Sequence, residues 1–240
     1  MSPRSARRRR VLVGASVLLC LSLVLWGLNT LVNSRTFQLG GTLVHRVATD
    51  ARVVALTFDD GPTEYTEEVL ATLAELDVTA TFYLTGRELE ENPGAGRLIA
   101  GAGHELGNHS YSHRRMVFHS PDFVASEIER TDEAIRATGY SGEITFRPPN
   151  GKKLYVLPRY LAEHGRTTVT WDVEPDSDAT ADADTIVAQT VRQVRPGSIV
   201  LLHVMYDSRE ASRAAIAPVV ESLRADGYEF VTVSELLRYR

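Results

Sequence analysis

Short runs of β-branched and aromatic residues alternate with helix-period segments along most of the chain, and this alternation limits the fold more than any other feature. Units of a strand followed by a helix build parallel sheets with helices packed on them. We therefore expect an α/β fold of about seven parallel strands, either doubly wound or closed into a barrel. The runs predict strands at Val53–Phe58, Thr79–Leu84, His104–Leu106, Glu143–Phe146, Thr168–Trp171, Ser198–His203 and Glu229–Val233. The periodic segments predict helices at Thr66–Leu76, Phe123–Thr138, Thr185–Val194 and Ala211–Ala225. Ser120 and Pro121 are expected at the N-cap and first position of the second helix.

An uncharged segment near the amino end is long enough to cross a membrane. Val11–Val32 contains 22 residues, and such a helix spans roughly 33 Å against a hydrocarbon core of about 30 Å. Five arginines lie among the first ten residues, and the positive-inside rule places a basic end of this kind in the cytoplasm. We expect a cytoplasmic end at 1–10, an uncleaved single-pass signal anchor in the cell membrane at 11–34, a linker at 35–50 and an extracytoplasmic domain at 51–240. A signal peptide cleaved near Ser34 and a buried core helix are the alternatives.

The rest of the chain is acidic. Beyond those five arginines it carries 21 basic residues against 31 acidic ones. Binding to a phosphate backbone requires a basic surface, so we expect no nucleic-acid partner. The single cysteine, Cys20, excludes an internal disulfide and a cysteine-based metal site.

Reactive side chains follow the carboxyl ends of several predicted strands. Because these ends meet at one edge of a parallel sheet or barrel, the side chains are expected to form one catalytic rim. In chain order the rim contains Asp59, Asp60, His109, His113, Arg147, Asp172, Glu174, Asp176 and His203.

Part of this rim has the composition of a metal site. The sequence HSYSH places His109 and His113 four positions apart, and one helical turn would bring both to the same metal ion. Two imidazoles and one carboxylate leave positions open, as in a catalytic zinc site. The same set suits ferrous iron in oxygenases, which remains an alternative. A hydrolase also needs a base and an acid, and Asp59 and His203 are available for these roles, which favours hydrolysis.

Two further side chains are expected to tune this base and acid. The guanidinium of Arg147 would hold Asp59 ionised. The carboxylate of Asp176 would raise the pKa of His203, so that the ring is protonated when a leaving amine needs a proton.

Each of these residues also has a plainer structural interpretation. The alternatives are a helix N-cap at Asp59 or Asp60, a surface cation at Arg147 and a core histidine at His203. We expect two other histidines, His104 and His119, to be structural or solvated.

Five motifs, TFDDGP, HSYSH, FRPPNG, WDVEPDSD and SIVLLH, occur in this order and resemble those of the polysaccharide deacetylases, the family of chitooligosaccharide and peptidoglycan deacetylases. The resemblance extends from about His45 to Leu237. It implies a distorted (β/α) barrel, a divalent metal that is usually zinc, and hydrolysis of an N-acetyl group on a sugar. It also implies metal ligands at Asp60, His109 and His113, a general base at Asp59 supported by Arg147, a general acid at His203 supported by Asp176, and an acetyl pocket lined by Leu201.

Two positions differ from the family pattern. Asn150 stands where an aromatic residue usually follows the prolines, and its backbone N–H is expected to hold the oxyanion. Ser177 stands where a tryptophan is common, which makes Asp178 a second candidate for the partner of His203. Trp171 is expected either to replace the missing ring in the sugar groove or to lie in the core.

The resemblance implies a metal-dependent N-deacetylase that releases acetate from N-acetylated amino sugars. Anchoring outside the cell favours a cell-envelope polysaccharide, peptidoglycan or a chitin-like oligomer, as the glycan partner. Hydrolysis of non-sugar amides or cyclic imides on the same site is the first alternative. An inactive glycan-binding module and the iron oxygenase follow it.

Overall fold

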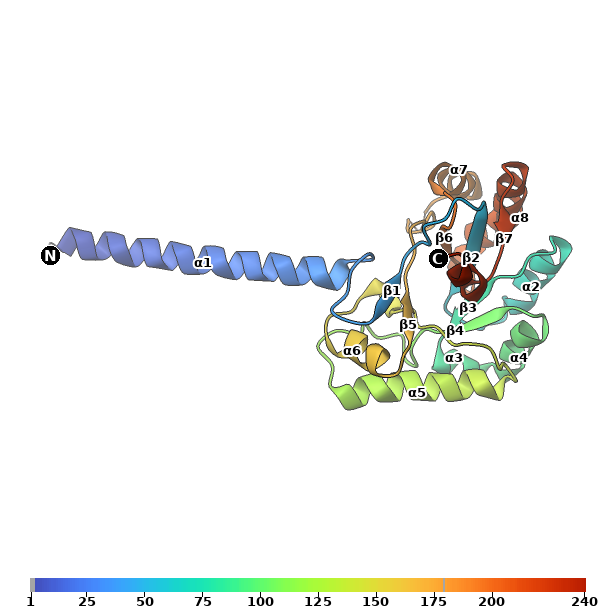
Figure 1. Ribbon diagram of the computed structural model, residues 1–240, viewed down its shortest axis with the longest axis horizontal. Helices are drawn as coiled ribbons and strands as arrows, with labels where there is room; N and C mark the ends of the chain where they lie inside the picture. The colour runs from blue at the N-terminus through green and yellow to red at the C-terminus, as the bar shows by residue number, and fades with distance from the viewer. Residues whose placement is uncertain (1–2, 179) are drawn as a thin grey trace.

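The computed structural model describes residues 3–178 and 180–240 (Figure 1). Its strands are β1 (Thr42–Val44), β2 (Val53–Asp59), β3 (Thr81–Leu84), β4 (Glu105–Asn108), β5 (Thr167–Val169), β6 (Ile199–His203) and β7 (Glu229–Phe230). Its α-helices are α1 (Pro3–Asn33), α2 (Thr66–Glu75), α3 (Gly86–Glu91), α4 (Pro93–Gly101), α5 (Pro121–Ala137), α6 (Val156–Glu163), α7 (Ala183–Gln193), α8 (Glu210–Ala225) and α9 (Val233–Leu236). Short 3-10 turns lie at Pro149–Gly151, Asp207–Arg209 and Leu237–Tyr239.

The expected α/β fold with parallel strands is confirmed, whereas the seven-stranded barrel is not. The hydrogen-bonded strands form a five-stranded sheet in the order β4-β3-β2-β6, with β7 also paired to β2, and a two-stranded sheet of β1 and β5. Phe146 connects the two sheets through single bridges to Asn108 on β4 and Thr168 on β5, and Val173, which follows β5, forms a single bridge to Val200 on β6.

The strand predicted at Glu143–Phe146 is therefore reduced to one bridging residue. Pro148 and Pro149 follow it closely, and proline has no N–H to continue a ladder. The sequence patterns also missed β1, α3, α4, α6 and α9, and the strand predicted at Glu229–Val233 is shorter because Val233 begins α9. Helix α4 follows α3 after a single residue and contains three glycines, so neither segment has a long helical period.

Strand β2 lies at the centre of the domain, and all seven of its residues are buried. Its side chains alternate between two apolar clusters, as the pleat requires. Val54, Leu56 and Phe58 join the larger cluster, whereas Val53 and Ala55 join the smaller one. Continuing this alternation, Thr57 and Asp59 are directed to the side of the smaller cluster, and the functional groups gather there.

Helices cover the sheet from several directions. Helices α7 and α8 lie side by side at one end of the domain, and α5 runs along the opposite side, below α6 and α3 in Figure 1. Ser120 caps α5 by accepting a hydrogen bond from Phe123 N–H, and Pro121 occupies its first turn, as the sequence predicts.

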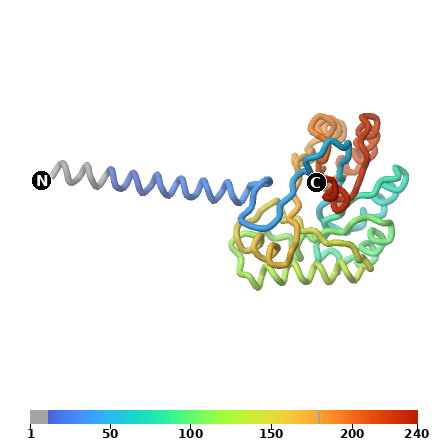
Figure 2. The backbone as a smooth tube through the Cα atoms, viewed as in Figure 1, coloured from blue at the N-terminus to red at the C-terminus, as the bar shows by residue number. Residues whose placement is uncertain are grey.

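Helix α1 extends away from the domain (Figures 1 and 2). Within it, Leu12–Asn33 is long and apolar enough to cross a membrane by length and composition, and none of its most apolar window is buried.

Truncation of Phe82 tests the larger apolar cluster. This side chain is fully buried, and its ring centroid lies 5.0 Å from that of Phe58. We expect Phe82→Ala to lower the free energy of unfolding by about 3–5 kcal/mol, because it removes buried area and leaves a cavity. Leu98→Ala, at an exposed position of α4, should change it by less than about 0.5 kcal/mol. Urea unfolding of the full chain in detergent measures both, and equal midpoints would contradict the assignment of Phe82 to the core.

Candidate active site

Strand β2 delivers two carboxylates to the edge of the sheet. Asp59 is its last residue and is the register partner of His203 on β6. Asp60 follows with a φ of 73°, and Gly61 with a φ of 78°. A Cβ on Gly61 would lie 2.7 Å from Met205 Cγ, so this tight turn requires glycine. The turn directs Asp59 toward Arg147 and Asp60 toward His113, while both carboxylates lie near His109 Nε2.

Helix α2 does not use these carboxylates as a cap. Its N-cap is Tyr65, which makes no side-chain capping bond. The N-cap interpretation of Asp59 and Asp60 is therefore wrong.

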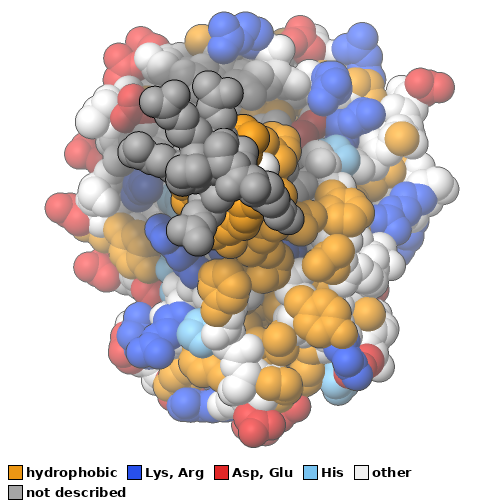
Figure 3. All heavy atoms as spheres, turned by 90° about the vertical axis from the view of Figure 1, so that its left-hand side faces the viewer, with side chains coloured by type: hydrophobic (Ala, Val, Ile, Leu, Met, Phe, Trp, Pro, Cys, Tyr) orange, Lys and Arg blue, Asp and Glu red, His pale blue; other side chains and the backbone are white. Residues whose placement is uncertain are grey.

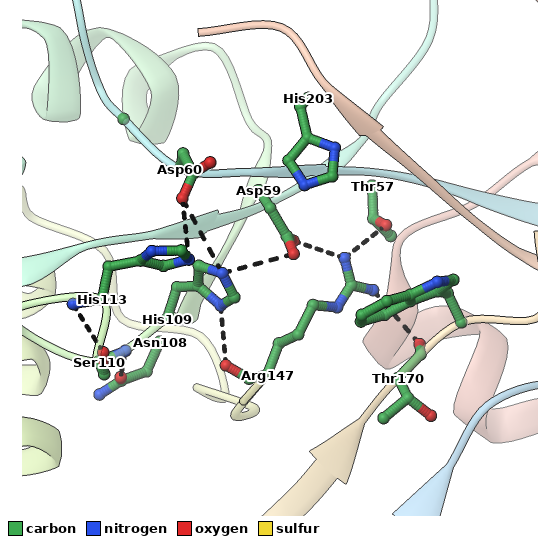
Figure 4. Close-up of polar contacts among 12 residues, drawn as sticks. Thr57, Asp59, Asp60, Asn108, His109, Ser110, His113, Arg147, Thr170 and His203 are labelled. Carbon is green, nitrogen blue, oxygen red and sulfur yellow. Dashed lines mark hydrogen bonds and ion pairs between the residues drawn. The ribbon is translucent and has the colours of Figure 1, made fainter. Parts of the chain in front are cut away.

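The loop after β4 brings His109 and His113 together without a helix. The ring centroids of the two histidines are 5.0 Å apart. However, Ser110 and His113 have φ values of 66° and 55°, which are not those of a right-handed helix. The expectation of a helical turn was therefore wrong, although the two rings do converge. Asn108 shapes the loop because its Oδ1 accepts from Ser110 N–H at 2.8 Å, and Ser110 Oγ accepts from His113 N–H at 3.1 Å (Figure 4).

Asp60, His109 and His113 form a ligand set. Asp60 Oδ1 lies 3.4 Å from His113 Nε2 and 4.0 Å from His109 Nε2, and one ligand atom from each residue lies within 4.8 Å of the others. Asp60 Oδ1 is also buried and has no hydrogen-bond partner. An orphaned carboxylate oxygen beside two imidazoles fits a divalent cation.

The protonation of His109 supports the same fit. Its Nδ1 lies 2.8 Å from the carbonyl oxygen of Arg147, which can only accept, so Nδ1 carries the proton. Burial lowers the pKa of His109, with nearby Asp59 opposing this effect, and the neutral ring then presents the lone pair of Nε2. That lone pair faces Asp59 Oδ2 at 3.5 Å and Asp60, a repulsive arrangement that a cation would relieve.

Arg147 is completely buried, so its interpretation as a surface cation is wrong. Its Nη1 donates to Asp59 Oδ1 at 2.7 Å and to Thr57 Oγ1 at 2.8 Å. Its guanidinium lies 4.0 Å from the ring centroid of Tyr83 and 5.6 Å from that of Trp171. Burial alone would raise the pKa of Asp59, but the charge of Arg147, followed by those of His109 and His203, holds it below its usual value. Asp59 is therefore ionised.

His203 is held by Asp176 rather than by Asp178. Asp176 Oδ2 accepts from His203 N–H at 2.7 Å, and Asp176 Oδ1 lies 3.3 Å from His203 Nδ1. Burial opposes protonation, but the hydrogen bond and charge of Asp176 outweigh it and raise the pKa of His203 to about 9. Asp178 instead accepts hydrogen bonds from Thr180.

Of these groups, Asp59, His109, His113 and His203 line one pocket of about 450 Å³. Figure 4 shows Asp59 between His203 and Arg147, with the two metal-site histidines on its other side. The pocket is lined by Asn33, Arg35, Asp59, His109, His113, Asn150, Lys152, Trp171, Glu174, Ser177, His203 and Arg209.

Two of the three residues predicted to bind the substrate line the pocket, and the third lies outside its lining. Asn150 lines the pocket with a φ of 53°, which asparagine tolerates better than most residues. Trp171 lines the pocket and also belongs to the smaller apolar cluster, where its Nε1 donates to Glu174 at 2.8 Å. Leu201 is buried in the same cluster, outside the pocket lining, so its role in an acetyl pocket stays a prediction.

Two histidines lie apart from this pocket. His104 Nδ1 accepts from Ala80 N–H at 3.2 Å, and burial lowers its pKa to about 4. His119 stacks on Phe123 with ring centroids 4.0 Å apart. Both have the structural character that the sequence predicts.

The sequence motifs missed several residues of the pocket mouth. Asn33 and Arg35 come from the end of α1 and the segment after it, outside the region of family resemblance. Arg35 Nη1 lies 3.1 Å from Glu174 Oε2. Lys152 directly follows the FRPPNG motif, and this position is the sequence feature that could have identified it as a residue of the pocket mouth.

Comparisons with known proteins agree with this geometry. A family model described as polysaccharide deacetylase matches residues 46–169. A peptidoglycan-N-acetylglucosamine deacetylase of Bacillus cereus is 33% identical over 203 residues, which cover 83% of this chain and 95% of that relative.

Two solved structures are similar along most of the chain. A crystal structure of a peptidoglycan N-acetylglucosamine deacetylase has a TM-score of 0.77 at 31% identity, covering 81% of this chain and 92% of that chain. A CE4 family pseudoenzyme from Bacillus anthracis has a TM-score of 0.75 at 28% identity, and the match covers 83% of this chain and 70% of that chain. The family model alone spans more than half of the sequence, and we conclude that the chain belongs to the polysaccharide deacetylase family.

Proposed function

We propose that the protein is a divalent-metal-dependent N-deacetylase, which hydrolyses the acetamide of N-acetylated amino sugars in a cell-envelope polysaccharide and releases acetate. One observation carries this proposal. An ionised carboxylate, Asp59, and a histidine with a raised pKa, His203, face one another beside the ligand set of Asp60, His109 and His113. Base, acid and cation site thus share one pocket, as amide hydrolysis requires.

The residues divide the reaction between them. A divalent cation, most simply zinc, would be held by Asp60, His109 and His113 and would supply Lewis-acid polarisation. The Asp59 carboxylate accepts a proton from the attacking water, and the Asn150 N–H would stabilise the oxyanion. His203 gives its proton to the departing amine as the carbon–nitrogen bond breaks. Acetate and a free amino sugar are the products.

Two supporting residues keep the base and the acid in opposite protonation states. Arg147 keeps Asp59 ionised through a 2.7 Å ion pair. Asp176 keeps His203 protonated and is itself fixed by Ser212 Oγ, which donates to Asp176 Oδ2 at 2.9 Å. Neither needs to touch the substrate, so both act as positioning residues.

The location follows from α1 and the charges before it. We infer that Leu12–Asn33 crosses the cell membrane once, and that the arginine-rich end lies in the cytoplasm. The pocket then faces the cell envelope, where the N-acetylated glycans would be reached.

Hydrolysis of a non-sugar amide is the second candidate. It is favoured by Asn150 and Ser177, which line the pocket where family members commonly present aromatic rings. Trp171 is the aromatic residue of the lining.

Asp59→Asn tests the reaction and the base together. The change keeps the size of the side chain but removes the proton acceptor, so acetate release from acetylated chitooligosaccharides and peptidoglycan should fall by about 10²–10⁴-fold. Bound metal should be retained. Asp178→Asn is the matched control at a carboxylate outside the pocket and should keep activity. Wild-type protein that holds metal but releases no acetate from either glycan would redirect the proposal to a non-sugar amide.

His113→Ala tests the ligand set. Loss of one of three protein ligands should lower the metal retained after dialysis, measured by elemental analysis of the full chain in detergent. His119→Ala changes a histidine that stacks on Phe123 instead and should retain wild-type metal. Unchanged metal content in His113→Ala would remove His113 from the site.

The pH profile tests His203 as the acid. Because the pKa of His203 is raised to about 9, kcat/KM should stay high below that pH and fall as the pH rises through it. Asp176→Asn removes the charge that favours the protonated ring and leaves burial, which lowers the pKa of His203, so the fall should move to lower pH. Ser212→Ala leaves that charge in place and should shift the profile less. Identical profiles for wild type and Asp176→Asn would exclude this acid.

A further inference from the structure

The end of α1 is fixed to the rim of the pocket by several contacts. Lys152 donates to the side chain of Asn33, and Lys153 donates to the carbonyl oxygen of Ser34. These are the only two lysines in the sequence. In addition, Thr170 Oγ1 donates to the carbonyl oxygen of Arg35 at 2.6 Å. The domain therefore directly adjoins the end of the apolar helix.

The length of the apolar helix places this junction at the surface of a bilayer. Leu12–Asn33 contains 22 residues, or roughly 33 Å of helix, which matches a hydrocarbon core of about 30 Å. Asn33 then lies where the hydrocarbon ends and the headgroups begin. Because Asn33 also lines the pocket, the pocket opens beside this junction.

Four large apolar side chains are exposed on the same side of the domain. We call Phe37, Leu39, Phe118 and Tyr155 the membrane-side patch, and their exposed fractions are 51%, 39%, 80% and 54%. Figure 3 views the molecule from the side from which α1 projects and shows hydrophobic side chains gathered around the helix.

Several contacts place these four residues around the junction. The segment from Phe37 to Gly41 borders α6, because a Cβ on Gly41 would lie 3.2 Å from Ala162 Cβ. Tyr155 directly precedes α6 and is two residues from Lys153. Phe118 belongs to the loop that bridges Lys153 through Met116, and this loop lies on the α1 side of the domain in Figure 1.

We propose that the membrane-side patch rests on the outer surface of the lipid bilayer, so that the catalytic pocket opens at the level of the lipid headgroups. The proposal rests on the proposed location of the protein. Aromatic side chains favour the membrane interface, and exposed apolar area next to a membrane span is buried there without another protein. The enzyme would then act on glycan presented at the membrane surface.

Fluorescence quenching in vesicles tests this orientation with the full chain. In a Cys20→Ser background, Phe118→Cys carries an environment-sensitive dye, and Leu98→Cys on α4 is the matched control at an exposed apolar position. The vesicles contain phosphatidylcholine, phosphatidylglycerol and a lipid with a nitroxide on its headgroup. We expect the dye at position 118 to be quenched about twofold or more relative to the dye at position 98.

Removal of the other patch residues completes the test. Adding Phe37→Ser and Tyr155→Ser should reduce quenching at position 118, while the unfolding midpoint in detergent shows whether the domain remains folded. If these changes do unfold the domain, the comparison of quenching at positions 118 and 98 in the otherwise unchanged protein still decides whether the patch lies on the bilayer.

Insertion of α1 is followed separately through Trp26, which lies within the apolar helix. Equal quenching at positions 118 and 98, with Trp26 quenched by brominated acyl chains, would overturn the proposal and leave the anchor in place. Loss of Trp26 quenching would overturn both the proposed contact of the patch with the bilayer and the proposed insertion of α1. Acetate release enters none of these measurements, so failure of the proposed reaction is recognised independently.

Discussion

Arg147 carries a full charge in a place without solvent, between the rings of Tyr83 and Trp171. An unpaired charge there would cost several kcal/mol, so the guanidinium requires the carboxylate of Asp59. The same residue also orients His109, a proposed metal ligand, because its carbonyl oxygen accepts a hydrogen bond from His109 Nδ1–H. One buried residue thus orients the proposed base through its side chain and the proposed cation site through its backbone. The remaining geometry of the pocket depends on this link.

Around Arg147, the same pocket gives two histidines opposite protonation states. His109 is buried against a carbonyl oxygen and has a lowered pKa, which suits a ligand that must offer a lone pair. His203 is only partly buried, with 21% of its side chain exposed, and the paired carboxylate of Asp176 raises its pKa to about 9, which suits a proton donor. The difference arises from the deeper burial of His109 and from the carboxylate partner of His203. A pocket that separates the pKa values of its titratable groups in this way can assign acid and base roles to them.

Much of this arrangement was predictable from sequence because it depends on local rules. Strand periodicity located β2 and β6, and the carboxyl ends of parallel strands gathered Asp59 and His203 at one edge. The shape of the HSYSH loop was not predictable, since it depends on the left-handed backbone of Ser110 and His113 and on bonds to Asn108. A spacing of four residues suggests a helix, yet a strained loop satisfies it equally well.

Long-range packing explains the other differences. Phe146 forms only single bridges because the prolines after Arg147 end the ladder. The pocket mouth was missed for a similar reason. Arg35 and Lys152 are more than a hundred positions apart, and no local pattern relates the end of an apolar helix to a loop after a proline pair. Only the folded chain brings them to one rim.

The two lysines also connect the loop that contains Asn150 to the end of α1. Asn150 lies two residues before Lys152, and Lys153 is almost fully buried with its ammonium on the carbonyl oxygen of Ser34. A soluble form that began after Ser34 would lose that acceptor and leave a buried ammonium to find another. The loop that contains Asn150 would then lose its contact with the segment after α1. The end of the apolar helix therefore supports the structure of the pocket, and removal of the helix would change the pocket as well as the localisation of the protein.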